Sequence, residues 1–357
     1  MHKTVRKIML MIITVIFTLT TFTGVTFAWL SINSDAWIEG MQIQATAGKG
    51  FLISVDNVSY KSNLRKDDLM KAVILKYRRS YSLDENGNLL DEAYEKVEPK
   101  DYAEIFNKIQ LQPCTSYNME GIELSNLNGT IIDPSKGEYL EFDIYFKSTG
   151  ELTKDLNIYL NGLDTVLHQD GNKYDVNRSR ILSDIDSIQL LGNLVTFDKF
   201  TGESIHKKYD DIIEVSSANA MRIGVIDELS KTTIVELTNE YDLGSYATNI
   251  SDYVDEHNAL YDENVVYDAK MDANKNAMFT YVADTAERLE PIDYKNVPKT
   301  IRSLTIGGTN SVCVAKLVSS QPVKKATFRI WLEGWDADCL DGLTKSIKVQ
   351  LSFVQQD

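Results

Sequence analysis

Apolar and polar residues alternate with a period of two in several segments of the chain. In one of them, Leu140, Phe142, Ile144 and Phe146 are separated by single polar or aromatic residues. This period places apolar side chains on one face of a strand and polar ones on the other. Gly48-Lys49-Gly50 separates the first two such segments and is interpreted as a hairpin turn. The pattern predicts strands at 41–47, 51–55, 139–146, 156–160, 221–225, 328–332 and 347–353.

Half-buried strands without intervening helices are typical of an antiparallel β-sandwich or barrel. Two stretches interrupt this rhythm. Residues 61–110 are charged, with expected helices near Lys66–Arg79 and Lys100–Ile109, and residues 229–300 are acidic and rich in Asn and Tyr. Because the strands on either side are alike, we interpret both stretches as insertions in one elaborated domain, residues 29–357.

The N-terminus has the pattern of an export signal. A basic start with Lys3, Arg6 and Lys7 precedes the uncharged segment Ile8–Val25 and the small-residue exit Thr26-Phe27-Ala28. This order predicts a signal peptide over residues 1–28. The apolar segment has about the length that spans a bilayer, so an uncleaved anchor contacting the membrane through residues 8–25 is the alternative.

The composition narrows the function classes. The chain has 357 residues, of which 43% are hydrophobic, enough to bury a core. It carries 52 acidic against 37 basic residues, a formal net charge of −15. A polyanion repels phosphate backbones, so nucleic acid is not an expected partner.

Cysteine is scarce, with only Cys114, Cys313 and Cys339. An exported protein can oxidise one pair of them and leave one thiol, and the spacing does not decide which pair. No CxxC motif is present, so a structural zinc site has no support.

No catalytic, cofactor-binding or metal-binding motif is recognised. The chain has four histidines but no HExxH, and it contains neither GxSxG, GxGxxG nor a P-loop. Asp84-Glu85-Asn86-Gly87-Asn88 is acidic, but its Gly comes too early for a calcium loop. We therefore predict a non-enzymatic protein without a cofactor.

The densest polar and aromatic segment runs from Trp331 to Asp341 between two predicted strands. One interpretation is a binding loop for a sugar or calcium-linked ligand. The other is a structural connection, in which Trp packs over the end of the sandwich and Asp side chains cap turn amides. The candidate binding residues are Trp331, Trp335, Asp336 and Asp338.

Both ends of the chain resemble a known family. Gly24-Val25-Thr26-Phe27-Ala28-Trp29-Leu30 is followed by a strand beginning Gly40-Met41-Gln42-Ile43-Gln44-Ala45, and Ile347–Phe353 forms a closing strand. These segments, with Tyr139–Phe146 as a central strand, are similar to the TasA/camelysin family of exported Gram-positive proteins. The resemblance covers less than half of the chain, and the middle departs widely.

The resemblance implies a jelly-roll-like β-sandwich, cleaved by a signal peptidase on export and assembled into extracellular matrix fibres of a biofilm. A freed N-terminal segment would complete the sheet of the next subunit, because an incoming strand satisfies unpaired edge amides. The donor would lie within Trp29–Ala47, with Trp29, Leu30, Met41 and Ile43 as candidate assembly residues.

The leading expectation is therefore a structural protein of the cell surface or extracellular matrix, which associates with itself or with other matrix proteins. The alternative is a cell-surface adhesin or glycan-binding module that uses the insertions and the Trp331–Asp341 loop. Camelysins have also been described as metallopeptidases, but this sequence offers no metal-binding motif to support that activity.

Overall fold

The computed structural model describes most of the chain from residue 42 onward. The signal-peptide prediction, Trp29, Leu30 and Met41 lie outside the described residues, as does most of the predicted insertion 229–300. The described residues are 42–48, 50–77, 80–109, 111–116, 123–126, 130–162, 165–167, 173–175, 178–189, 194–197, 204–208, 210–227, 231–237, 300–301, 304–308, 310–334, 336, 338–339 and 347–356.

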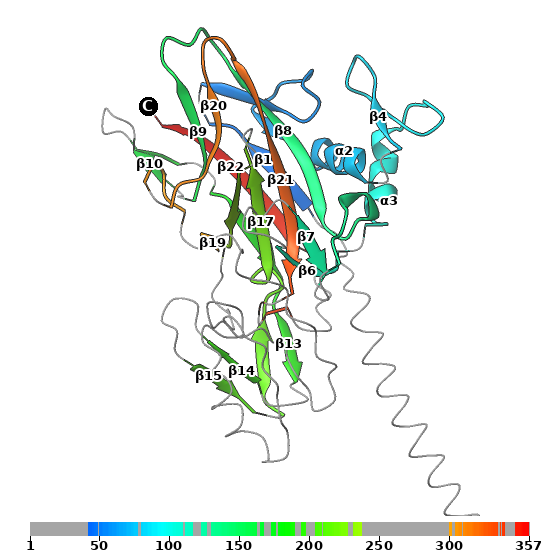
Figure 1. The fold of residues 1–357 in the computed structure, drawn as a ribbon, viewed down its shortest axis with the longest axis vertical. Helices are drawn as coiled ribbons and strands as arrows, with labels where there is room; N and C mark the ends of the chain where they lie inside the picture. The colour runs from blue at the N-terminus through cyan, green and yellow to red at the C-terminus, as the bar shows by residue number, and fades with distance from the viewer. Residues whose placement is uncertain are drawn as a thin grey trace, which may run out of the picture.

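Two β-sheets face each other in a sandwich (Figure 1). The first, which we name the terminal sheet, contains the first and the last described strands side by side. Its order is β20 (Cys313–Leu317), β9 (Leu156–Leu160), β22 (Ile347–Gln356), β1 (Gln42–Thr46) and β3 (Asn63–Leu64), and β12 (Arg180–Ser183) also pairs with β22.

The second sheet, the central sheet, is built around the long strand β21 (Val323–Glu333). On one side β21 pairs with β8 (Leu140–Ser148), which in turn pairs with β2 (Phe51–Ser54). On its other side the order continues through β17 (Met221–Ile226), β18 (Thr232–Val235) and β19 (Thr300–Ile301). The end of β21 also pairs with β6 (Pro113–Ser116), which forms a hairpin with β7 (Leu124–Asn126).

Aromatic residues join the two sheets across the core. Phe142 of β8 and Phe328 of β21 stack with ring centroids 5.7 Å apart in the central sheet. Phe353 of the terminal sheet meets Phe146 edge-on at 5.0 Å and Phe328 at 5.7 Å. All of these side chains are buried, as the period-two pattern predicts. The prediction of an all-β sandwich is confirmed, although the pairs β1–β22, β18–β19 and β21–β6 are parallel.

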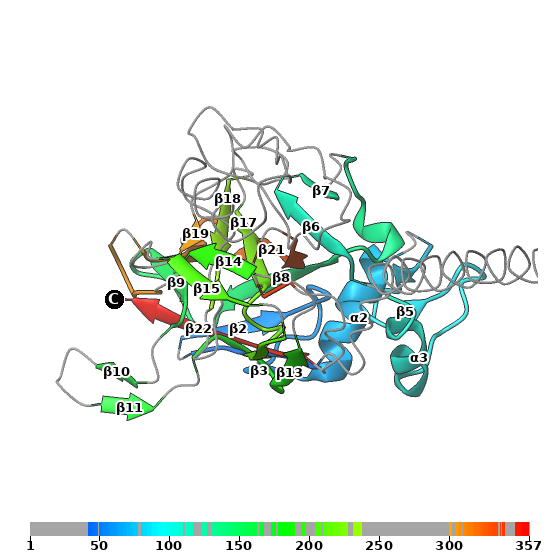
Figure 2. The same cartoon turned by 90° about the horizontal axis from the view of Figure 1, so that it is seen from below.

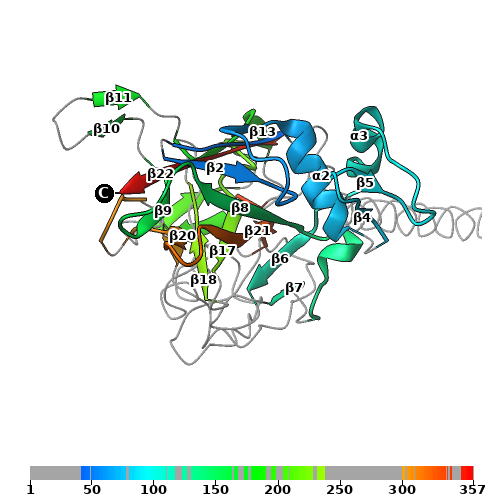
Figure 3. The same ribbon diagram turned by 90° about the horizontal axis from the view of Figure 1, so that it is seen from above.

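The predicted helices also exist, in shorter form. Helix α2 (Lys66–Lys76) begins where Arg65 N donates to the Asp68 carboxylate at 3.0 Å, and it has acidic residues in its first turn. Its apolar face joins the main core through Leu69 and Ile74. Figure 3 shows α3 (Tyr102–Phe106) and the short strands β4 (Ser82–Leu83) and β5 (Leu89–Leu90) beyond α2. A short 3₁₀ helix, η1 (Pro99–Asp101), precedes α3.

The prediction of a hairpin at Gly48-Lys49-Gly50 is wrong. β1 pairs with β22 and β3 in the terminal sheet, whereas β2 pairs with β8 in the central sheet. The segment therefore crosses from one sheet to the other. A Cβ on Gly48 would lie 2.9 Å from the Phe353 carbonyl oxygen, and Gly50 has φ of +84°, so the crossover requires glycine at both positions.

Strands β9 and β12 lie end to end along β22, and a hairpin leaves the sheet between them. This hairpin, β10 (Thr165–Leu167) and β11 (Lys173–Asp175), lies at the periphery of the molecule (Figure 2). Ser179 closes the gap, because its hydroxyl donates to Ser352 O at 3.1 Å and accepts from Ser352 N at 3.0 Å. The sequence pattern did not predict two further two-stranded sheets, which pair β13 (Asp186–Gln189) with β16 (Ile212–Val215) and β14 (Leu194–Phe197) with β15 (Ser204–Lys207).

Candidate functional site

The N-terminal strand β1 occupies a slot beside the last strand of the chain. All five residues of β1 are in parallel register with β22, from Gln42 opposite Lys348 to Thr46 opposite Ser352. On its other side, β1 pairs with β3 only through Ala45 and Thr46. The ladder to β22 is thus the longer of the two that pair with β1, and helix α2 is a further neighbour of the strand.

β22 needs a partner strand along the edge that β1 now covers. Its residues Val349, Leu351 and Phe353 are buried in the main core, so the strand cannot leave the sandwich. If β1 were removed, the edge of β22 along this register would present unpaired N–H and C=O groups. Of the candidate assembly residues, only Ile43 lies in the described part of the chain, within β1.

The predicted binding loop begins with a buried tryptophan. Trp331 is 0% exposed and packs with Cys114, Tyr139 and Ile234 on the outer face of the central sheet. Its ring lies over the neighbouring strand, where a Cβ on Gly224 would be 3.0 Å from it. The indole N–H donates to the Glu333 carboxylate at 3.1 Å. Trp331 therefore anchors this end of the sheet.

The two candidate aspartates bind the protein's own groups. Asp336 Oδ2 is 2.5 Å from Arg222 Nη2, and the same nitrogen is 3.4 Å from Glu236 Oε2. Asp336 Oδ1 accepts from Asp338 N at 2.9 Å, and Asp338 Oδ1 accepts from Asn219 Nδ2 at 3.4 Å. All five residues are buried.

Charge and burial oppose each other at Arg222. Burial lowers the pKa of the Arg222 guanidinium. The carboxylates of Glu236 and Asp336 raise it by more than burial lowers it, so the pKa lies above its usual range. Nη1 of Arg222 also donates to the carbonyl oxygens of Asn219 and Met221 at 3.0 and 3.1 Å. We name Arg222, Glu236 and Asp336 the buried ion cluster.

This geometry agrees with the structural interpretation of the segment, in which Trp packs over the sandwich and an Asp caps a turn amide. Trp335 lies outside the described residues. Sequence reasoning missed Arg222 and Glu236, since an Arg on the polar side of an alternating strand looks like a solvent-facing residue. The available signal was the acidic run at Asp336 and Asp338, which needs a buried cation once the loop is covered.

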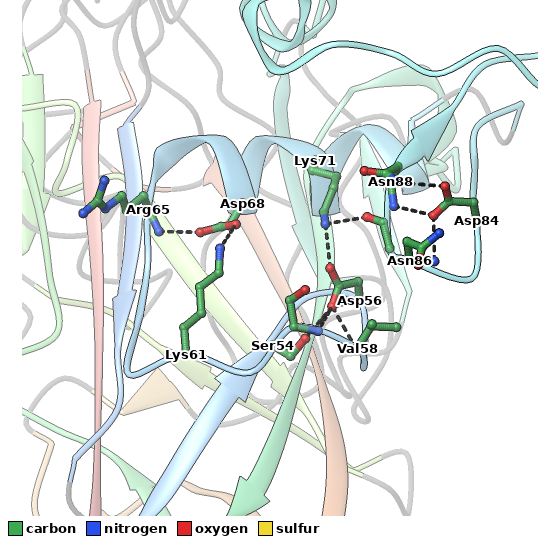
Figure 4. Close-up of polar contacts among 12 residues, drawn as sticks. Ser54, Asp56, Val58, Lys61, Arg65, Asp68, Lys71, Asp84, Asn86 and Asn88 are labelled. Atoms are coloured by element: carbon green, nitrogen blue, oxygen red, sulfur yellow. Dashed lines mark hydrogen bonds and ion pairs between the residues drawn. The ribbon is translucent and has the colours of Figure 1, made fainter.

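A second polar junction fastens α2 to the sandwich (Figure 4). Lys71 Nζ lies 2.7 Å from Asp56 Oδ2 and donates to Gly87 O at 2.8 Å. Asp56 Oδ1 accepts from Ser54 Oγ at 2.7 Å and from Ser59 N at 2.8 Å. One buried ion pair therefore connects the end of β2, helix α2 and the β4–β5 hairpin.

The turn of that hairpin explains the acidic segment at Asp84. The Asp84 carboxylate accepts from Asn86 N at 2.9 Å, and from both N and Nδ2 of Asn88 at 2.7 Å (Figure 4). Gly87 has φ of +78°, and a Cβ there would meet the Asp56 carboxylate. The carboxylate closes its own loop, as an Asx turn does.

Acid is expected to weaken the junction at Asp56. Burial raises the pKa of this carboxyl, but Lys71 and the hydrogen bonds from Ser59, Ser54 and Val58 lower it to about 2. Because the folded pKa lies below the unfolded one, the stabilisation is complete above about pH 4 and is lost as the pH falls through about 2. Urea denaturation of wild type and Asp56→Asn should therefore give stabilities that differ at pH 6 and converge toward pH 2. A difference that stays constant over this range would contradict the assignment.

The described residues contain no group of three or more His, Cys, Asp or Glu side chains arranged to hold a metal ion. The three cysteines all lie in the described part, and all are thiols, so the predicted disulfide remains a prediction.

Comparison with protein-family models, curated proteins and solved structures finds no match to this chain. Within the described ranges, no helix is long and apolar enough to cross a membrane. A functional proposal therefore depends on the geometry of the chain and on the resemblance of its two ends.

Proposed function

We propose that this protein is an exported, non-enzymatic structural subunit of the cell surface or extracellular matrix, which assembles into fibres by strand complementation. The observation that carries the proposal is the position of β1. It is the first described strand, it pairs in parallel with the last strand over its whole length, and it leaves the terminal sheet through the Gly48–Gly50 crossover.

Backbone pairing supports exchange between copies. A slot that holds β1 by hydrogen bonds to β22 accepts the same five-residue segment from a second chain with identical geometry. The β1 of each chain would then complete the terminal sheet of a neighbour. Such a head-to-tail contact builds an open filament when the rotation between successive subunits does not close a ring, and the proposal takes the open form.

The export signal fits this scheme. In the proposal, the signal peptide keeps the segment before β1 tethered to the membrane, and its removal by a signal peptidase frees the donor strand. The jelly-roll-like arrangement and the biofilm-matrix location belong to the same proposal and are supported by the resemblance to the TasA/camelysin family.

The test compares residues 29–357 with a free N-terminus against the same chain behind an N-terminal blocking tag. We expect the free chain to elute as large species in size-exclusion chromatography and to form filaments in negative-stain micrographs, whereas the tagged chain stays monomeric. A chain that lacks residues 29–39 is the control for the role of the segment that precedes β1. Monomers from both the free and the tagged chain would overturn the proposal.

The glycan-binding alternative gains no support from the described residues. Trp331, Asp336 and Asp338 are buried and engaged within the fold, so a sugar would have to displace these contacts. Sugar-dependent thermal stabilisation that is lost in Trp335→Ala would restore this alternative.

A further inference from the structure

β6 joins the central sheet through a short contact. Its parallel register with β21 consists of two pairs, Leu332 with Pro113 and Glu333 with Cys114. Cys114 is fully buried here, beside Trp331. The hairpin of β6 and β7 thus depends on few backbone bonds to the rest of the sheet.

The chain beyond β21 turns back over this contact. Gly334 N donates to Cys114 O at 3.0 Å, which places the end of β21 directly against the cysteine. Asp336 N then donates to Glu333 O at 3.1 Å, and Cys339 N donates to Asp336 O at 3.0 Å. Two successive turns therefore keep Cys339 close to the end of β21 instead of leading it away.

The buried ion cluster holds this double turn in place. Asp336, the residue shared by both turns, is fixed by Arg222, and Asp338 by Asn219. Burial raises the pKa of the Cys114 thiol, and the carboxylate of Glu333 and the neighbouring Cys339 raise it further. The two turns place Cys339 near the end of β21, where its side chain packs against the main core.

Cys313 lies elsewhere in the fold. It belongs to β20 of the terminal sheet, where it is in register with Tyr159 of β9 and its thiol faces Ala315 O. A tight turn with a bridge between Val318 and Gln321 joins β20 to the start of β21, whereas Cys114 pairs with Glu333 at the opposite end of that 11-residue strand. A disulfide needs Cα atoms about 4.4–6.8 Å apart, so Cys313 is too far along β21 to reach Cys114.

We propose that Cys114 and Cys339 form an intramolecular disulfide under oxidising conditions, and that Cys313 remains a thiol. The bond fastens the β6–β7 hairpin to the double turn after β21. This inference is independent of the proposed assembly, because neither cysteine lies in the terminal sheet.

The reaction is a thiol–disulfide exchange with a low-molecular-weight disulfide such as oxidised glutathione. Cys313 is the most exposed of the three cysteines, but within the proposed pair Cys339 is more accessible than the buried Cys114. The Cys339 thiolate therefore attacks one glutathione sulfur and releases one glutathione thiolate. Cys114 then attacks the Cys339 sulfur, and its proton leaves with the second glutathione, which is released as a thiol. The protein loses two electrons and two protons, and the glutathione disulfide is reduced to two thiols.

The experiment incubates the purified full chain with oxidised glutathione, alkylates the remaining thiols with N-ethylmaleimide in denaturant and maps the peptides by mass spectrometry. We expect two of the three thiols to disappear and one peptide pair to link Cys114 with Cys339. Cys313→Ser, the matched control, should form the same link, and Cys339→Ser should not. Reduction should lower the Tm of oxidised wild type and Cys313→Ser, and leave that of Cys339→Ser unchanged.

Several outcomes would overturn the assignment. These are three alkylated thiols after oxidation, a link that contains Cys313, a lasting glutathione adduct at Cys339, or a disulfide-linked dimer. The Cys313→Ser variant keeps the result interpretable if a change at buried Cys114 prevents folding.

Discussion

Replacing Arg222 by methionine is expected to destabilise the protein by about 3–5 kcal/mol. The substitution keeps most of the side-chain volume but removes the cation from the buried ion cluster. Asp336 and Glu236 are 1% and 0% exposed, so their carboxylates cannot turn to water for compensation. The carbonyl oxygens of Asn219 and Met221 also lose a donor.

Urea denaturation monitored by tryptophan fluorescence measures this effect, since Trp331 lies on the same face of the central sheet. Arg180→Met is the matched control, because Arg180 is an exposed strand residue whose guanidinium Nε donates to Gln350 Oε1 at 3.1 Å. It should change the stability by less than about 1 kcal/mol. A similarly small effect at Arg222 would show that the cluster contributes little.

A combined variant separates charge from packing. If the loss comes from unpaired carboxylates, Arg222→Met with Asp336→Asn and Glu236→Gln should recover part of the stability of Arg222→Met. If it comes from packing, the three changes should be at least as destabilising as the single one.

The sequence predicted the sandwich because the alternation of apolar and polar residues in a half-buried strand shows which of its faces is buried. In β8 the residues Leu140, Phe142, Ile144 and Phe146 alternate, and all four are buried as this period requires. The two helices of the first insertion were also predictable from their composition. The start of α2 at Lys66 was predicted, but its end was not, because Tyr77 takes an extended conformation that the composition does not indicate.

Long-range pairing could not be predicted in the same way. Gly48-Lys49-Gly50 has the composition of a hairpin turn, and only the pairing of β1 with β22, some three hundred residues later, makes it a crossover. Arg222 likewise differs from an exposed arginine only through Glu236 on the neighbouring part of the chain and Asp336 far along it, and neither contact is visible in the alternation. Alternation tells which face of a strand is buried, but it does not tell which strand lies beside it.

Outlying hairpins such as β14–β15 escaped prediction for another reason. Their strands have four residues each, Leu194–Phe197 and Ser204–Lys207, too short for a period of two to stand out from chance. The Trp331–Asp341 segment was, in contrast, easy to detect, but its role could not be predicted. Its Trp and Asp residues stood out clearly, but their residue types suit a ligand site and a buried anchor equally well.

A chain that begins at Ala47, and so lacks β1, is expected to lose about 5 kcal/mol of stability and to bind a synthetic peptide of residues 41–47. The truncation removes a five-residue parallel ladder, in which each hydrogen bond contributes about 1 kcal/mol, and uncovers the edge of β22 from Lys348 to Ser352. Thermal unfolding with and without the peptide measures both effects.

The control peptide carries proline at Ile43 and Gln44. Neighbouring N–H groups of a strand point to opposite sides, so one of these two faces β22, and its loss should abolish the stabilisation. If the truncated chain unfolds at the same temperature as the intact one, β1 does not complete the terminal sheet. If the native peptide restores stability while the intact chain never polymerises, β1 closes its own subunit, and the assembly proposal fails although the slot is real.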